Sequence, residues 1–259
     1  MGLPLVTVVT PSLDQGLFLA DAIESVIAQR YEPVEHLIVE GGSTDETGAV
    51  IDRYRDRVRV IDERPRRGQA YAVNLGFKAA NGEIVGWLNA DDRYVPDAFR
   101  TVVEAFADAP DVDVVFGNWE VIDADGRVVE RHRGAPYDTT EQLQGINLIA
   151  QPTVFVRRRL FDRIGYLDES LHYVMDYELW LRASQVAEPR WLDATLAQFR
   201  VHDASKTTSQ WLSFWPESRR VARAYGGPFF SRGFRLRYLN VAFAKEVGGH
   251  ALRRVGLRE

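Results

Sequence analysis

Short apolar segments alternate with amphipathic segments through residues 5–88, and this alternation restricts the fold more than any other feature. Apolar and β-branched residues predict strands at 5–10, 36–40, 58–61 and 84–88. Apolar residues at helical spacing predict helices at 19–27, 43–54 and 68–80. Nearly continuous apolar strands separated by helices are typical of a largely parallel sheet that is covered on both faces. We therefore expect an α/β fold.

In the second half of the chain we expect both parallel and antiparallel strands. A strand is predicted at 112–116, and two further segments, 119–122 and 127–131, flank the turn signal Asp-Ala-Asp-Gly at 123–126. The two strands of a hairpin are antiparallel, so the sheet is expected to become mixed in this region.

Basic and aromatic residues gather near the end of the chain. We expect one domain over 1–210 and a helical extension over 211–259. The extension holds ten Arg or Lys and three Glu, a charge of +7; since the whole chain carries −5, residues 1–210 carry −12. Two interpretations remain open. Either the extension binds an anionic membrane surface, or its helices pack their aromatic side chains on the domain.

Composition favours a cytoplasmic protein. The hydrophobic content of 46% is ordinary for a globular domain, and no cysteine is present for a disulfide or a thiolate metal site. No apolar run is long enough to span a membrane, and the first residues lack a secretory signal pattern. We expect a cytoplasmic location, peripheral on the inner face of the membrane if the extension binds lipid, and no nucleic-acid partner.

Two adjacent carboxylates follow the strand at 84–88, in the sequence Asn89-Ala90-Asp91-Asp92. In an open α/β sheet, ligands bind outside the carboxyl ends of the strands. Side-by-side carboxylates repel each other unless a cation lies between them and a ligand, so the pair predicts a divalent metal with a phosphate beyond it. The alternative is a turn before the next helix, in which Pro96 suits a first helical position.

Two more turns are expected at the same edge of the sheet, Thr10-Pro11-Ser12 and the segment 40–45. Glycines in the second turn allow a ligand to approach the backbone. Ser43 and Glu46 match a capping box, whose helix would direct N–H groups at an anion. Alternatively, Asp45 and Glu46 are first-turn acids that only stabilise that helix. The chain holds neither a dinucleotide fingerprint nor a P-loop.

Six segments occur in a characteristic order: Val-Thr-Val-Val-Thr-Pro-Ser at 6–12, Glu-Gly-Gly-Ser-Thr-Asp at 40–45, Gly-Gln-Ala-Tyr-Ala-Val-Asn-Leu-Gly-Phe at 68–77, Gly-Trp-Leu-Asn-Ala-Asp-Asp at 86–92, Asp-Tyr-Glu-Leu-Trp-Leu-Arg at 176–182, and Phe-Arg-Val-His-Asp-Ala-Ser-Lys at 199–206. Each is weak alone. Together they resemble family-2 glycosyltransferases of the GT-A fold, over residues 5 to about 206.

The resemblance implies a mostly parallel, Rossmann-like central sheet flanked by helices, with a mixed second half. It also implies an inverting transfer of a sugar from a nucleotide-diphosphate donor, with a UDP-sugar favoured. The acceptor would be a saccharide or a lipid-linked saccharide, in cell-envelope or exopolysaccharide synthesis.

The resemblance further implies a metal site. Asp92 stands in the place of the family's last metal-motif acid and would bind Mg²⁺ or Mn²⁺. Asp91 would contact the metal through water or bind the donor's ribose. His202 matches a histidine that contacts the metal or the diphosphate, although a solvated loop histidine is the alternative. Lys206 would add positive charge. The metal would neutralise charge on the leaving group.

Asp176 occupies the position of the family's catalytic base. Transfer with inversion needs one carboxylate near the acceptor hydroxyl, opposite the leaving diphosphate. Because Asp176 begins a helical stretch, a helix cap is the alternative. Glu178 is the nearby competitor for the role of base.

The donor and acceptor sites follow from the same resemblance. The donor's base and ribose are expected near Thr10, Pro11, Ser12, Glu40 and Asp45. A phosphate would pair with Arg67 or Arg66. Gln69 and Asn74, polar in an otherwise apolar helix, would contact sugar hydroxyls unless they are simply exposed to solvent. The acceptor side is expected to include Gln151, His172, Tyr173 and Trp180.

Two positions depart from the family pattern. Many members carry an acid, which reads the uracil of a UDP donor, where this chain has Gly41; Glu40 is a possible substitute. The first metal-motif acid is replaced by Asn89 or Ala90, depending on how the motif is framed.

Two other functions compete with the transferase. A catalytically inactive nucleotide-sugar-binding protein would need a damaged base or metal site, whereas Asp91, Asp92 and Asp176 are all present. A nucleotidyltransferase would carry a lysine-containing, glycine-rich phosphate loop near its N-terminus, whereas residues 10–20 hold no lysine and one glycine.

Overall fold

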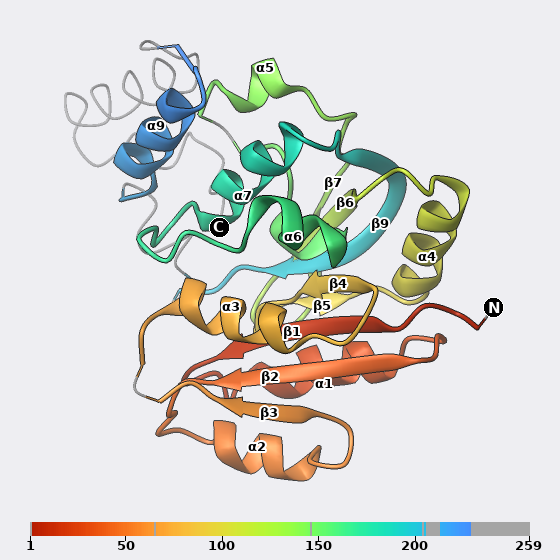
Figure 1. The fold of residues 1–259 in the computed structure, drawn as a ribbon. Coiled ribbons are helices and arrows are strands. Elements are labelled where there is room, and N and C mark those ends of the chain that lie inside the picture. Colours follow the sequence, from red (N-terminus) through yellow and green to blue (C-terminus); the bar gives the residue numbers. More distant parts are fainter. Residues whose placement is uncertain (1, 65, 146, 204, 206–212, 229–259) are drawn as a thin grey trace.

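The structure is a computed structural model and describes residues 2–64, 66–145, 147–203, 205 and 213–228. Within these residues, nine strands form one sheet with helices on both of its faces (Figure 1). The strand order is β3-β2-β1-β4-β8-β6-β9-β5, and β7 pairs with β6 at the side. This arrangement confirms the predicted α/β fold.

The first four strands are parallel neighbours: β1 (Val6–Ser12), β2 (Val34–Glu40), β3 (Arg59–Asp62) and β4 (Ile84–Trp87). Their register pairs Ser12 with Glu40 and Glu40 with Asp62. The carboxyl ends of β1, β2 and β3 therefore meet at one edge of the sheet (Figure 1). The turns that follow these strands lie at this edge, as the sequence predicts.

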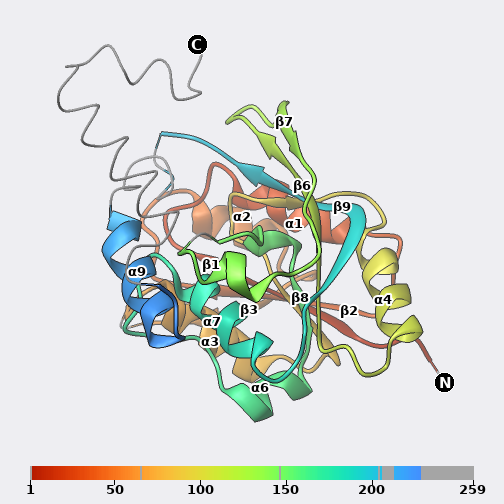
Figure 2. The ribbon, with the colours of Figure 1, turned by 90° about the horizontal axis from the view of Figure 1, so that it is seen from above.

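The remaining strands make the sheet mixed: β5 (Arg93–Tyr94), β6 (Val114–Ile122), β7 (Val128–His132), β8 (Phe155–Arg157) and β9 (Arg190–Arg200). β8 lies antiparallel between β4 and β6, whereas β9 runs parallel to β6. β6 and β7 form the predicted hairpin, which projects from the body of the protein in Figure 2. The strand predicted at 112–116 and the first hairpin strand predicted at 119–122 are one continuous strand, β6.

One face of the sheet is covered by α3 (Gln69–Ala79), α6 (Arg159–Ile164) and α7 (Met175–Ser184), and the other by α1 (Leu19–Ile27), α2 (Thr47–Arg53) and α4 (Ala98–Asp108). Neighbouring residues of β1 alternate between the two cores: Val9 packs with α3, and Val8 packs with α1. Both valines are fully buried. Burial on both faces explains why these strands read as continuous apolar runs.

Helix α3 approaches β1 closely. A Cβ atom added to Gly76 would lie 2.2 Å from Cγ1 of Val9, so a glycine at this position permits the contact. The close packing sets the start of α3, at Gln69, beside the carboxyl edge of the sheet.

The predicted capping box at Ser43 is wrong. Helix α2 begins at Thr47, and the side chain of Ser43 accepts a hydrogen bond from the backbone N–H of Asp14 instead. Asp45 accepts from the N–H of Thr47 and from the N–H of Gly16. The turns after β1 and β2 are therefore joined to each other, and this tertiary contact displaces the local cap.

The described part of the extension, which includes α9 (Phe214–Ala224), packs on the domain. The carboxylate of Glu217 accepts hydrogen bonds from the backbone N–H groups of His172, Tyr173 and Val174, just before α7. Tyr225 donates to Glu178 at 2.6 Å. Packing is therefore the correct interpretation for this helix, while residues 229–259 lie outside the described residues and their membrane contact stays a prediction.

Two short helices complete the fold, α5 (Thr139–Gln142) and η1 (Gln151–Thr153). Of the helices that the structure describes, none is both long and apolar enough to cross a bilayer.

Candidate active site

The acidic turn that follows β4 contains one buried and one accessible aspartate. Asp92 is 1% exposed. One of its carboxylate oxygens accepts a hydrogen bond from the N–H of Arg200 at 2.9 Å, and the other accepts from Nδ2 of Asn89 at 3.3 Å. Burial, with the charge of Asp91 beside it, raises the pKa of Asp92 well above its usual range. In this structure Asp92 ties β9 to the turn, and its role as a metal ligand stays a prediction.

Asp91 pairs with His202. Nε2 of His202 lies 3.1 Å from Oδ2 of Asp91, and their side chains are 11% and 21% exposed. The ring of Phe18 packs on the imidazole, with the ring centroids 4.7 Å apart. Asp91 was expected to contact the metal through water or to bind the donor's ribose, and His202 to contact the metal or the diphosphate. These two residues are in contact on the accessible side of the turn.

Arg200 holds this arrangement together from inside the protein. Its side chain is 1% exposed, and its Nε donates to the backbone carbonyl of Asp91 at 2.8 Å. One guanidinium nitrogen pairs with Asp21 at 2.6 Å, and the other donates to the carbonyls of Asp123 and Ala124. The guanidinium thus joins α1, the acidic turn and the hairpin turn, which positions both aspartates.

Asp91 and His202 suit one side of a divalent metal site. No group of three or more His, Asp or Glu side chains that could hold a metal lies within the described ranges. Mg²⁺ is usually bound by one or two carboxylates together with waters and substrate phosphates, rather than by a complete protein cage. Two protein ligands at an accessible edge therefore fit a cation whose remaining ligands come from a diphosphate and water.

Asn89 connects the acidic turn to both neighbouring elements. Its Oδ1 accepts hydrogen bonds from Nε2 of Gln69 and from Nε1 of Trp87, each at 3.0 Å. Its Nδ2 donates to Oε1 of Gln151 at 2.9 Å. An aspartate at this position would lack that donor and would add a charge beside Asp92, so the replacement of an acid by Asn89 suits the local network.

Asp176 lies at the start of α7. Its carboxylate accepts a hydrogen bond from Nδ2 of Asn147 at 2.7 Å. Burial raises the pKa of Asp176 to about 6, although hydrogen bonds, including the one from Asn147, act in the opposite direction. A carboxylate with a pKa near neutrality is suited to accept a proton in a general-base step.

Glu178 has a structural partner instead. Both of its carboxylate oxygens bond to the guanidinium of Arg182, at 2.9 and 2.7 Å, and it also accepts from Tyr225. Glu178 is 8% exposed. This competitor for the role of base is therefore engaged in joining α7 to α9.

A small pocket lies between the starts of α3 and α7. It is lined by Arg67, Gly68, Gln69, Ala70, Glu169, Leu171, His172 and Met175. Gln69 bonds to Asn89 of the acidic turn, and Met175 precedes Asp176 in sequence. The pocket is therefore connected to the acidic turn through Gln69 and to the start of α7 through Met175.

The predicted donor residues are divided between the edge and the interior. Thr10 is fully buried and bonds to Nε2 of His36 at 2.9 Å. Ser12 is also buried, Pro11 is partly buried, and Asp45 is exposed. The oxygens of Glu40 accept from the N–H groups of Gly42 and Ser43 at 2.8 and 2.6 Å. The carboxylate considered as a substitute for an acid at Gly41 is thus engaged by its own turn.

Asn74 bonds to the loop before α7 rather than facing solvent. Its Nδ2 donates to the carbonyl of Leu167 and to Glu169, and its Oδ1 accepts from the N–H of Leu167 at 2.9 Å. Asn74 is 3% exposed, so the expectation of solvent exposure is wrong, and this placement gives no support to contact with a sugar. Arg67 is exposed; its guanidinium stacks 4.1 Å from the ring centroid of Tyr71.

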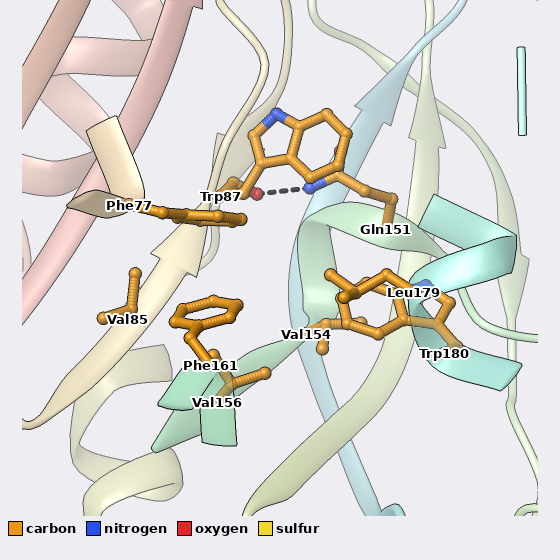
Figure 3. Close-up of a pocket in the computed structure, with 9 residues that line it drawn as sticks. All are labelled: Phe77, Val85, Trp87, Gln151, Val154, Val156, Phe161, Leu179 and Trp180. Atoms are coloured by element: carbon orange, nitrogen blue, oxygen red, sulfur yellow. Dashed lines mark hydrogen bonds between the residues drawn. The ribbon is translucent and has the colours of Figure 1, made fainter. Parts of the chain in front are cut away.

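The predicted acceptor residues do not lie together: some are in the core and others are at the surface. Trp180 is 3% exposed and lines an apolar pocket in the core, with Gln151 at one side (Figure 3). Nε2 of Gln151 donates to the carbonyl of Trp87 at 2.5 Å. His172 is exposed and Tyr173 is partly exposed, beside α9. The burial of Trp180 does not support a stacking face for a sugar, and Lys206 lies outside the described residues.

The family is decided by sequence comparison. A family model described as glycosyl transferase family 2 matches residues 7–165. The chain belongs to glycosyltransferase family 2. An uncharacterized glycosyltransferase of Rickettsia typhi is 30% identical over 213 residues, which are 80% of this chain and 67% of that protein. The O-antigen biosynthesis protein RfbC of Myxococcus xanthus is 31% identical over 70% of this chain, but that match spans only 14% of RfbC.

Solved structures share the fold. Residues 1–349 of TarS from S. aureus superpose with a TM-score of 0.64 at 20% identity, covering 85% of this chain and 64% of that one. The mannosyltransferase PcManGT from Pyrobaculum calidifontis, solved with GDP-Man and Mn²⁺, has a TM-score of 0.60 at 17% identity, covering 95% of this chain and 81% of that one. The chain thus has the fold of these glycosyltransferases and spans less than two thirds of the TarS structure.

Several residues around the site of this family-2 glycosyltransferase were not predicted. Asn147 and Glu217 contact the start of α7 from distant parts of the chain, so no local spacing marks them. Glu63 directly follows β3. In the same way, Glu40 is the last residue of β2, and the acidic turn comes after β4. This position after a strand could have identified Glu63 from the sequence, because it places Glu63 at the carboxyl edge of the sheet.

Proposed function

We propose that this glycosyltransferase moves a sugar, with inversion, from a nucleotide-diphosphate donor to a saccharide or lipid-linked acceptor. A UDP-sugar is the favoured donor. The observation that carries the proposal is the contact of Asp91 with His202 after β4. Asp176, whose pKa is raised to about 6, supports it from the start of α7. Asp91 and His202 suit a diphosphate with its cation, and Asp176 suits proton abstraction.

The donor's diphosphate is proposed to lie beside Asp91 and His202. When bound, Mg²⁺ or Mn²⁺ would neutralise the negative charge that develops on the leaving diphosphate. Arg200 keeps the backbone of the turn in place through Asp91, and Asn89 fixes its opposite side through Gln69 and Gln151. These hydrogen bonds keep the turn rigid, which limits the reorganisation needed during transfer.

Asp176 is proposed to act as general base. Its carboxylate accepts the proton of the acceptor hydroxyl, the hydroxyl oxygen bonds to the anomeric carbon, and the bond from that carbon to the diphosphate breaks. Attack from the side opposite the leaving group inverts the configuration. Asn147 orients the carboxylate and lowers its pKa, which keeps more of it ionised near neutral pH.

Synthesis of a cell-envelope polysaccharide or an exopolysaccharide is the proposed setting. The name of RfbC refers to O-antigen biosynthesis, and TarS has been solved with UDP and with UDP-GlcNAc. PcManGT has been solved with GDP-Man. These neighbours support a nucleotide sugar as donor and leave the acceptor to be identified by assay.

A thermal-shift screen tests the proposal. UDP, GDP, CDP, ADP and dTDP are compared with and without Mn²⁺, since a ligand that binds the folded state raises its melting temperature. We expect a nucleoside diphosphate to stabilise the chain more with Mn²⁺ than without, followed by turnover of the matching nucleotide sugar. No shift with any nucleotide contradicts the proposal; binding without hydrolysis or transfer to a broad acceptor panel favours the inactive binding protein.

A further inference from the structure

Two segments from different parts of the chain determine where the carboxylate of Asp176 lies. Residues 172–174 directly precede α7, in which Asp176 is the second residue. Asn147 belongs to the segment that follows α5, and its Nδ2 donates to Oδ2 of Asp176 at 2.7 Å. The direction of this carboxylate therefore depends on how both segments are held.

Helix α9, which lies beside α7 (Figure 2), holds the first of these segments. Glu217 accepts hydrogen bonds from the backbone N–H groups of His172, Tyr173 and Val174, at 3.1, 2.6 and 3.1 Å. The side chain of Glu217 is 12% exposed. Hydrogen bonds to an ionised carboxylate are among the stronger ones, so three of them fix this backbone just before α7.

The same helix also holds the second segment. Ser218, which is 7% exposed, donates from Oγ to the carbonyl of Gly145 at 2.8 Å. Just after α9, a Cβ atom added to Gly227 would lie 2.7 Å from the carbonyl oxygen of Leu143, so the backbone packs directly on this segment. Asn147 comes two residues after Gly145. Both contacts therefore lie within four residues of the donor to the base.

Gln142 supports the inner side of this second segment. Gln142 is fully buried, and its carbonyl accepts hydrogen bonds from the hydroxyl of Tyr177 and from the N–H of Gly145. Its Oε1 accepts from the N–H of Leu148 at 2.8 Å. Asn147 itself is exposed, so the direction of its amide depends on the backbone that carries it. Without α9, only the inner support would remain.

We infer that α9 is a positioning element for the general base, in which Ser218 holds the segment that presents Asn147 to Asp176 while Glu217 holds the segment before α7. The inference rests on the proposed function. Ser218 acts through Asn147, so it is a positioning residue rather than a catalytic one. The base is then fully assembled only when the described part of the C-terminal extension is docked on the domain.

Titratable groups on the packed elements have other surroundings. Glu178 on α7 is held in an ion pair, Glu217 on α9 is bonded to backbone N–H groups, and His172 is exposed. A hydrogen bond to the ionised carboxylate lowers its pKa, and Asn147 supplies such a bond. A change in the segment that presents Asn147 should therefore raise the pKa of Asp176.

The pH profile of Ser218→Ala tests this role. With a base whose pKa is about 6, kcat of the wild type at pH 6 should be about half of its value at pH 8. In Ser218→Ala we expect this ratio to fall about two- to threefold further, because less of the base is ionised at pH 6. The affinity for UDP with Mn²⁺, measured by calorimetry, should stay unchanged. An acid limb at the wild-type position overturns the inference.

Ser25→Ala is the matched control. Oγ of Ser25 also donates to a backbone carbonyl, that of Ala22 at 2.7 Å, but within α1. The control should lower the melting temperature and leave the acid limb in place; an equal shift in Ser25→Ala overturns the inference. Gly227→Ala disturbs the same segment while keeping Ser218, and it should move the limb in the same direction, so the test holds even where Ser218→Ala fails to fold.

A double variant separates positioning from a general loss of stability. If Ser218 acts through Asn147, then Ser218→Ala combined with Asn147→Ala should have the acid limb of Asn147→Ala alone. Additive shifts of the limb overturn the inference. A wild-type chain that transfers no sugar contradicts the proposed function itself, whereas transfer with the same pH profile in the wild type, Ser218→Ala and Gly227→Ala contradicts only the role of α9.

Discussion

His202 lies 3.1 Å from Asp91, although 111 residues separate them in sequence. The contact brings the loop after β9 onto the acidic turn after β4. Asp92, beside Asp91, instead turns inward and bonds to the N–H of Arg200. The two aspartates therefore have different surroundings, and they are expected to respond differently to mutation.

Asp91→Asn and His202→Ala should remove metal-dependent turnover while leaving the fold intact. Several kcal/mol of charge stabilisation would be lost, so we expect a fall of about 100-fold or more in kcat/KM at saturating Mn²⁺. Donor hydrolysis is measured across a Mn²⁺ titration, with melting temperature as the control. Asp92→Asn is the comparison: it should lower the melting temperature, because it disturbs a buried bond to β9. Full metal-dependent activity in Asp91→Asn contradicts this assignment.

The rate should depend on pH through Asp176. The base works only when ionised, so kcat should be flat above its pKa of about 6 and fall about tenfold per pH unit below it. Asn147→Ala removes a hydrogen bond that lowers this pKa, and it should therefore move the acid limb to higher pH. Asp176→Asn should abolish transfer but retain donor binding.

Glu178→Gln is the matched control for Asp176. It weakens the bonds to Arg182 and should cost about 1.5–3 kcal/mol of unfolding free energy. The acid limb of its pH profile should match that of the wild type. If the pH profile changes in Glu178→Gln and not in Asn147→Ala, Glu178 rather than Asp176 is the base.

Glu217 links α9 to the residues just before α7. Glu217→Ala leaves the N–H groups of His172, Tyr173 and Val174 without their acceptor, so we expect a loss of about 1–3 kcal/mol. Because these residues precede Asp176, kcat should fall more than donor affinity. Arg220→Ala is the control: Arg220 is 64% exposed and lies 3.8 Å from Glu217, so its removal should change stability little. Equal melting temperatures for the two variants would argue against docking of α9.

Two helical glycines should respond in opposite ways to alanine. A Cβ atom at Gly48, in α2, meets nothing within 4 Å, so Gly48→Ala should add about 0.4–1 kcal/mol of stability. At Gly76, in α3, the same atom would lie 2.2 Å from Val9, so Gly76→Ala should cost about 1–3 kcal/mol. Urea unfolding measures both. A stabilising Gly76→Ala would contradict the close packing of α3 on β1.

The end of the chain can be tested for membrane binding without disturbing α9. Residues 229–259 hold seven Arg or Lys and two Glu, a charge of +5. Truncation after Pro228 keeps α9, and the melting temperature is measured as a control for folding. We expect the truncated protein to sediment less with anionic vesicles, and this difference should shrink at high salt. Equal sedimentation removes the membrane interpretation.

Local patterns in the sequence were sufficient to predict the parallel half of the sheet. β1, β2 and β4 each contain a short apolar run, and their residues are buried on both faces of the sheet. The same reasoning predicted that Asp91 and Asp92 would follow a strand at a ligand-binding edge. β9 was missed, because its exposed and buried residues follow no regular alternation.

The sequence by itself therefore determined the fold class and the position of the acidic turn after a buried strand, because hydrophobic periodicity is a property of neighbouring residues. Only the tertiary structure decided which of these acids are buried and which partners they have. Asp91 contacts His202, Asp92 is buried, and Glu178 is held by Arg182. These outcomes depend on burial and on partners far apart in the chain, which local spacing does not encode.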